Sequence, residues 1–183
     1  SEVDEVEKRI REAIKRHRDR VKKIIDEIKK LLDDHRRRVK KLEDDLKKRA
    51  DDVRKETKDG DRDKRTLVER VREELERARR EIEEDLKRSR EELKKIEKKA
   101  REVHKKSRDD LERLREEIER KVKGKEARDR IRELLKKYED DLRRSEKEIE
   151  DILRRYEREL RESEKRMREV LKRLEDELRR AEK

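Results

Sequence analysis

Residues 10–46 read IREAIKRHRDRVKKIIDEIKKLLDDHRRRVKKLEDDL, and the spacing of their apolar side chains is the most informative pattern in the sequence. Over the longer stretch from Val3 to Thr57, apolar or small inward positions recur about every 3.6 residues, which is the period of a straight α-helix. A sustained heptad would instead give about 3.5 residues and a left-handed supercoil. The pattern therefore predicts a long, nearly straight helix with one apolar face.

Charged residues make up 67% of the 183 residues and apolar residues 26%, a composition typical of disordered chains or coiled coils. Proline, cysteine, tryptophan and phenylalanine are absent, and so are asparagine and glutamine. The lack of cysteine excludes disulfides and thiolate metal sites. Because no apolar run approaches the roughly 18 residues of a membrane span, we expect a soluble protein that does not bind membranes and is cytoplasmic when expressed recombinantly.

Two interruptions of the apolar pattern divide the chain into three segments. The first lies around Gly60, which permits a left-handed helix end, and Asp61 or Asp63 can cap the helix that follows. The second lies around Gly124, which we expect to end the second helix. The predicted helices span about residues 2–58, 64–122 and 126–182, with turns at about 59–63 and 123–125.

Short turns make consecutive helices antiparallel neighbours. The predicted fold is therefore all-α: a long antiparallel up-down-up three-helix bundle with nearly straight, uncoiled helices, forming a single domain over residues 1–183. The other two segments keep the same apolar period as the first, so each helix offers one apolar face of about 100 to 120°. One face per helix suits a closed core and predicts a monomer.

Polar residues interrupt these apolar faces at a fixed interval of 18 positions, which is about five turns of a straight helix. The like pairs are His17 and His35, Ser89 and Ser107, Tyr138 and Tyr156, and Ser145 and Ser163. When the helices fold back at the two turns, His35 comes level with Ser89 and Ser163, and His17 with His104, Ser107 and Ser145. The sequence therefore predicts two buried polar layers, with Tyr138 and Tyr156 within one or two turns of them.

Histidine and serine can satisfy each other in an apolar core, because imidazole donates at one nitrogen and accepts at the other, while a hydroxyl does both. A buried group left unpaired costs about 1 to 3 kcal/mol, so shifted helix registers are penalised. We interpret the layers as structural devices that specify register. In its restricted alphabet, uniform period and repeated layers, the whole chain resembles de novo designed helical bundles with buried hydrogen-bond networks. The resemblance implies a designed structural scaffold with no natural biochemical function.

Catalysis and metal binding fit the same residues less well. Serine and histidine with Asp85 or Asp109 are the residue types of a nucleophilic triad, but a slender bundle core offers no cleft for a substrate. His17 and His104 fall at one level, yet a third zinc ligand is missing from the inward faces. The sequence therefore predicts no enzyme activity, no catalytic residue, no metal and no other cofactor.

The net charge of +11 raises the question of nucleic-acid binding. Apart from runs such as Arg36 to Arg38, the basic excess is spread over the three segments, and no groove-reading motif or exposed aromatic residue accompanies it. We expect no specific nucleic-acid partner and no required partner of any kind. One alternative stays open: a designed assembly or binding module, a rigid rod that docks with copies of itself or a designed partner and responds to pH through its buried histidines.

Overall fold

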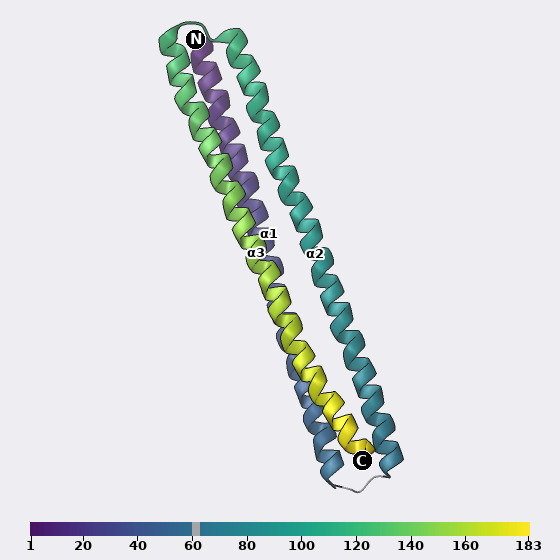
Figure 1. The fold of residues 1–183 in the computed structure, drawn as a ribbon. Coiled ribbons are helices and arrows are strands. Elements are labelled where there is room, and N and C mark those ends of the chain that lie inside the picture. The colour runs from purple at the N-terminus through teal and green to yellow at the C-terminus, as the bar shows by residue number, and fades with distance from the viewer. Residues whose placement is uncertain (60–62) are drawn as a thin grey trace. The chain divides into compact units, whose positions relative to one another are not determined.

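The computed structural model describes residues 1–59 and 63–183, and in these ranges the chain forms three α-helices (Figure 1). α1 spans Glu2–Asp59, α2 spans Lys64–Lys121 and α3 spans Lys125–Glu182. The predicted all-α three-helix bundle is confirmed. Gly60 and Asp61, the predicted helix end and cap, lie outside the described residues. Asp63 precedes α2, and its carbonyl oxygen accepts a hydrogen bond of 3.1 Å from the Leu67 amide.

Gly124 lies between α2 and α3 and immediately precedes α3, whereas the sequence predicts it as the C-terminal cap of the preceding helix. At the end of α2, the Val122 amide donates a hydrogen bond of 2.9 Å to the Ile118 carbonyl oxygen. Gly124 follows with a φ of 96°, a conformation that only glycine adopts without a steric penalty. Its carbonyl oxygen accepts the amide of Arg128 at 3.1 Å, which is the first bond of α3. The glycine therefore lies in the turn between the two helices and caps the start of α3.

The helices pack in two compact units, and each helix contributes a segment to both. Unit 1 comprises Ser1–Lys30 and Lys94–Arg155, and unit 2 comprises Leu31–Leu93 and Tyr156–Lys183. In unit 1, Arg9 of α1 pairs with Glu117 of α2, and Glu27 of α1 lies 3.4 Å from Lys99 of α2. Residue numbers thus fall along α2 as they rise along α1, so the two helices are antiparallel.

α3 runs parallel to α1 within unit 1. Glu7 of α1 pairs with Arg130 of α3 at 2.7 Å, and Arg18 pairs with Asp141 at 2.8 Å, so residue numbers rise together along the two helices. Taken with the antiparallel α2, this is the predicted up-down-up order. Among the described residues, no helix is apolar over enough of its length to span a membrane.

Each unit has its own apolar core, formed by the inward faces of its three helix segments. The buried core of unit 1 contains Val6, Ile10, Ala13, Ile14, Leu111, Leu114, Val122, Ile131, Tyr138 and Leu142. That of unit 2 contains Val39, Leu46, Ala50, Val53, Leu67, Val71, Leu75, Ala78, Ile82, Leu86, Met167, Val170, Leu174 and Ala181. Because burial of one such large aliphatic side chain stabilises a fold by about 1.5 to 3 kcal/mol, these cores hold the helices together.

Candidate functional site

Unit 1 contains a buried cluster, here called the first polar layer, of His17, Ser107, Ser145 and Tyr138. His17 projects from α1 and is 1% exposed. Its Nδ1 atom lies 2.6 Å from Ser107 Oγ of α2, and its Nε2 atom lies 2.9 Å from Ser145 Oγ of α3. One imidazole therefore links all three helices, and both of its nitrogens are used inside an apolar surrounding.

Unit 2 contains an equivalent cluster, here called the second polar layer, of His35, Ser89, Ser163 and Tyr156. His35 Nδ1 lies 3.0 Å from Ser89 Oγ and His35 Nε2 lies 2.9 Å from Ser163 Oγ. All four side chains are buried. Each member stands 18 positions from its counterpart in the first polar layer, and the two layers have the same histidine–serine arrangement.

The hydrogen bonds of the serines define which nitrogen of each imidazole carries the proton. Ser145 Oγ bonds the Leu142 carbonyl at 2.9 Å, and a carbonyl only accepts, so the hydroxyl hydrogen of Ser145 is used there. His17 Nε2 must then donate to Ser145, which leaves Nδ1 to accept from Ser107. Ser163 Oγ bonds the Glu159 carbonyl at 2.6 Å, which assigns the same neutral Nε2–H tautomer in the second polar layer.

The two tyrosines pack against the imidazoles but differ in their hydroxyl groups. The ring centroids of His17 and Tyr138 are 6.0 Å apart, and those of His35 and Tyr156 are 6.1 Å apart. Tyr138 donates to the carbonyl oxygen of Ser107 at 2.9 Å. The buried hydroxyl of Tyr156 has no hydrogen-bond partner within residues 1–59 and 63–183. The second polar layer thus contains an unsatisfied group where the first contains a bond.

An ion pair between α1 and α3 flanks each layer. In unit 1 Arg18 Nε lies 2.8 Å from Asp141 Oδ2, and in unit 2 Arg36 Nε lies 2.7 Å from Glu159 Oε2. Both arginines are largely exposed, so each pair contributes little to stability, about 0 to 1 kcal/mol. The carboxylates of Asp141 and Glu159 each place a negative charge near an imidazole.

Arg38 gives the second polar layer a direct contact with charged groups. Its Nη2 atom donates to Ser89 Oγ at 3.1 Å and to Glu92 at 3.4 Å, while its Nε atom donates to Asp85 Oδ1 at 3.3 Å. Asp85 is 11% exposed, and its Oδ2 atom has no hydrogen-bond partner in the described part of the chain. The position that corresponds to Asp85 in unit 1 is Val103, so this carboxylate belongs to the second layer alone.

Arg20 is the counterpart of Arg38 in unit 1. Its Nη1 atom lies 3.2 Å from Asp110 Oδ2 of α2, and Asp110 stands 18 positions from Glu92, the partner of Arg38. The predicted layers did not include these arginines and carboxylates. The signal that would have found them is the same interval of 18 positions, which relates Arg18 to Arg36 and Arg20 to Arg38.

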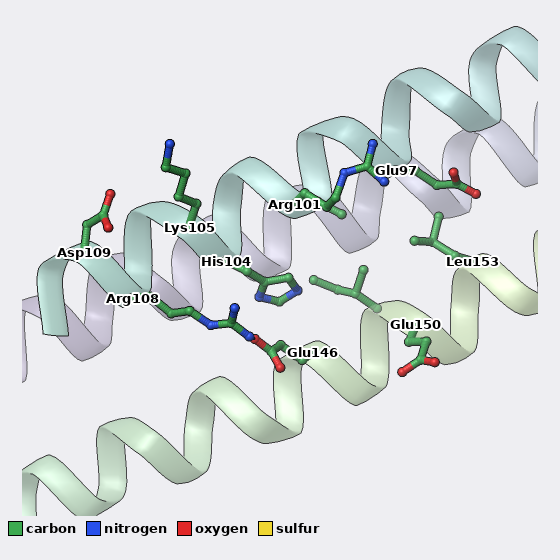
Figure 2. Close-up of a pocket in the computed structure, with 11 residues that line it drawn as sticks. Glu97, Arg101, His104, Lys105, Arg108, Asp109, Glu146, Glu150 and Leu153 are labelled. Atoms are coloured by element: carbon green, nitrogen blue, oxygen red, sulfur yellow. The ribbon is translucent and has the colours of Figure 1, made fainter. Parts of the chain in front are cut away.

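The structure places His104 beside the first polar layer, not within its hydrogen bonds. His104 is half-buried and lines a groove of about 540 Å³ between α2 and α3 of unit 1. Figure 2 shows its ring directed from α2 toward α3, with Arg108 reaching to its partner Glu146 beside it. Its Nδ1 atom is buried without a hydrogen-bond partner among the residues described. In unit 2 the corresponding position is Leu86.

Burial sets the protonation state of these groups. Desolvation lowers the pKa of His17, His35 and His104 below the ordinary value of 6.5, so all three are neutral at pH 7. At His17 the neighbouring His104 lowers the pKa further. Burial raises the pKa of Tyr138 above its ordinary value, and it raises the pKa of Tyr156 to about 12.

The chemistry available to the layers is hydrogen bonding. Ser145 and Ser163 give their protons to backbone carbonyls and accept from imidazole, so neither is activated as a nucleophile. Ser107 and Ser89 do donate to imidazole but are 0% exposed, so no substrate reaches them. Within the described ranges, no three His, Cys, Asp or Glu side chains gather closely enough to hold a metal ion.

No protein-family model matches the chain, and no curated protein matches it. Among solved structures, the chain is similar to a computationally designed three helix bundle, with 17% sequence identity and a TM-score of 0.36 over 99% of this chain and 84% of that chain. A similarity this low carries no conclusion about function. The functional conclusion therefore depends on the two polar layers themselves.

Proposed function

We propose that the chain is a designed structural scaffold in which the two polar layers specify the pairing and axial register of the helices. The observation that carries this proposal is the bridging geometry: each histidine bonds one serine on α2 and one on α3. An apolar core alone discriminates weakly between registers, because aliphatic side chains pack against many partners. A histidine that bonds two other helices has few alternative positions.

The penalty for a shifted register follows from the burial of the layers. Sliding one helix by a single turn, about 5.4 Å, would separate each imidazole from its serines. Every buried polar atom left unpaired would then cost about 1 to 3 kcal/mol. Because both layers would break together, a shift would cost more than either layer alone. The restricted alphabet, with no proline, cysteine, asparagine or glutamine, supports a designed origin.

Distance measurements between spin labels would test this role. Labels at Lys15 of α1 and Lys106 of α2 lie on exposed positions of unit 1 and report the offset of the two helices. The variant that removes the histidine–serine bonds of both layers carries H17L, H35L, S89A, S107A, S145A and S163A, and it keeps Tyr138 and Tyr156. We expect one narrow distance distribution in the parent chain and a second population, displaced by about one helical turn, in the variant. A single unchanged distribution in the variant would show that the layers do not set register.

A designed assembly module is the alternative function, and the oligomeric state of the chain distinguishes it from a monomeric scaffold. Light scattering across a range of concentrations is the appropriate measurement. A constant mass near 22.9 kDa supports the scaffold, whereas a mass that rises with concentration supports self-assembly.

A further inference from the structure

The two units differ in how they would accommodate a proton, although their layers share the same geometry. Unit 1 holds two histidines, His17 and His104, and unit 2 holds one, His35. In each layer the imidazole is neutral with Nδ1 as an acceptor. A proton added there turns an acceptor into a donor that faces the hydroxyl hydrogen of Ser107 or Ser89. The hydrogen-bond change is therefore the same in the two units, and the surrounding charges decide the difference.

The charges around His17 do not favour an imidazolium. Asp141 of α3 favours the imidazolium through its backbone and its carboxylate, but the carboxylate is paired with Arg18. Glu159 in unit 2 is paired with Arg36 in the same way. Arg20 of α1 and His104 of α2 act against a positive charge on His17. Protonation of one imidazole of unit 1 thus disfavours protonation of the other while the unit is closed. Opening the unit relieves this repulsion and hydrates both rings.

The charges around His104 oppose one another. Glu146 of α3 favours its protonated form and Arg108 of α2 disfavours it, and these two side chains form an ion pair with each other. The buried Nδ1 atom has no partner in the described residues, so a proton placed there would find no acceptor in the closed unit. Since the ring lies at the groove between α2 and α3, water reaches its buried Nδ1 atom once these helices separate.

His35 lies among more carboxylates. Asp85 and Glu92 of α2 and Glu159 of α3 all favour its imidazolium, and Arg38 of α1 opposes them. Ser89 also accepts a hydrogen bond from Arg38, which leaves one lone pair of its oxygen to accept from a protonated Nδ1 once its hydroxyl turns away. Unit 2 therefore accommodates its single proton at lower cost than unit 1 accommodates two.

We propose that unit 1 is an acid-labile half of the chain, which opens when His17 and His104 bind protons, while unit 2 stays closed to lower pH. A group whose pKa is lowered by folding binds more protons in the open state than in the closed state. The protection of the unit 1 amides against exchange is therefore full above pH 6.5, the pKa of unfolded histidine, and decreases as the pH falls below that value. Each proton that is taken up on opening makes the opening constant increase by up to about tenfold for each pH unit of acidification.

Amide hydrogen exchange resolved by residue tests the proposal, after correction for the intrinsic pH dependence of exchange. Between about pH 6.5 and about pH 5.5 we expect the opening constant to rise by up to about 100-fold per pH unit in unit 1 and up to about 10-fold in unit 2. The matched variant is H104L, because leucine occupies the corresponding position in unit 2. In H104L, the opening constant of unit 1 should rise by up to about 10-fold per pH unit, as expected for uptake of a single proton.

Two results would overturn the proposal: parallel loss of protection in the two units, or an unchanged dependence of unit 1 in H104L. Titration of the imidazole carbon-bound protons by NMR gives an independent check, since His17 should titrate at lower pH than in H104L. These readouts concern proton uptake and not helix offset. The spin-label distances at neutral pH therefore test the proposed scaffold role separately.

Discussion

The hydroxyl group of Tyr138 donates a hydrogen bond of 2.9 Å to the backbone carbonyl of Ser107, so the first polar layer is tied to the main chain of α2 as well as to its side chain. The corresponding hydroxyl of Tyr156 is buried without a partner in the described residues. This difference between two equivalent positions gives a direct comparison of one satisfied and one unsatisfied hydroxyl.

Y138F should therefore lower stability, whereas Y156F should not. Y138F removes a hydrogen bond and should lower the free energy of unfolding by about 0.5 to 1.5 kcal/mol. Y156F removes a buried, unpaired hydroxyl and should leave stability unchanged or raise it by about 1 kcal/mol. Urea denaturation monitored by circular dichroism measures both. Equal losses in the two variants would contradict the hydrogen-bond assignment.

Removing part of a layer should cost more than removing all of it. S107A leaves the Nδ1 atom of His17 buried and unpaired, so we expect a loss of about 1 to 3 kcal/mol. The triple variant H17L/S107A/S145A replaces the whole hydrogen-bonded set with apolar groups and should be at least as stable as S107A. Denaturation midpoints give the comparison. If the triple variant proved the less stable of the two, the layer would contribute net stability and not mainly specificity.

The buried tyrosines should make the fold sensitive to alkali. Folding raises the pKa of Tyr156 to about 12, above the ordinary value of 10.0, so the stability that this group contributes is full below 10.0 and is lost as pH rises toward 12. Tyrosinate absorbance should accordingly appear together with the loss of helical circular dichroism. In Y156F the tyrosinate absorbance comes from Tyr138 alone, so this variant separates the two titrations. Ionisation near pH 10 with intact helices would mean that the rings are hydrated.

Gly124 should resist substitution for reasons of backbone conformation. With a φ of 96° it occupies a region that residues with a Cβ atom rarely adopt, although an added Cβ would meet nothing within 4 Å. We expect G124A to lower stability by about 1 to 2 kcal/mol and G124N, which tolerates positive φ better, to lower it less. Thermal unfolding of the two variants tests the order. Equal stability of G124A and the parent would show that the turn readily adopts another conformation.

The sequence predicts the fold because the helix period and the turn residues are local features. The apolar period of 3.6 and the glycine of the second turn predict three helices, and short turns predict their directions. The level of a residue along the bundle also follows from counting residues, which places His35 level with Ser89 and Ser163. In the structure His35 bonds both.

Side-chain direction is the part that counting does not supply. Counting places His104 level with His17, yet its ring lies at the groove between α2 and α3, because rotation about the helix axis and the rotamer decide which way it points. The same holds for Tyr156, whose hydroxyl has no hydrogen-bond partner in the described residues, whereas that of Tyr138 bonds the Ser107 carbonyl. Arg38 was missed because a long surface side chain can turn back over the core, and sequence spacing alone does not say when it does.

The most direct test of the account is the protonation state and tautomer of the imidazoles of His17 and His35, measured by nitrogen-15 NMR at about pH 7.5. Serines that donate to backbone carbonyls require a neutral ring with the proton on Nε2 and an unprotonated Nδ1 in both residues. Separate signals of that tautomer, with slow exchange of the Nε2 proton, are the predicted result. A proton on Nδ1, or averaged signals typical of a hydrated ring, would contradict the bridging of three helices by each histidine.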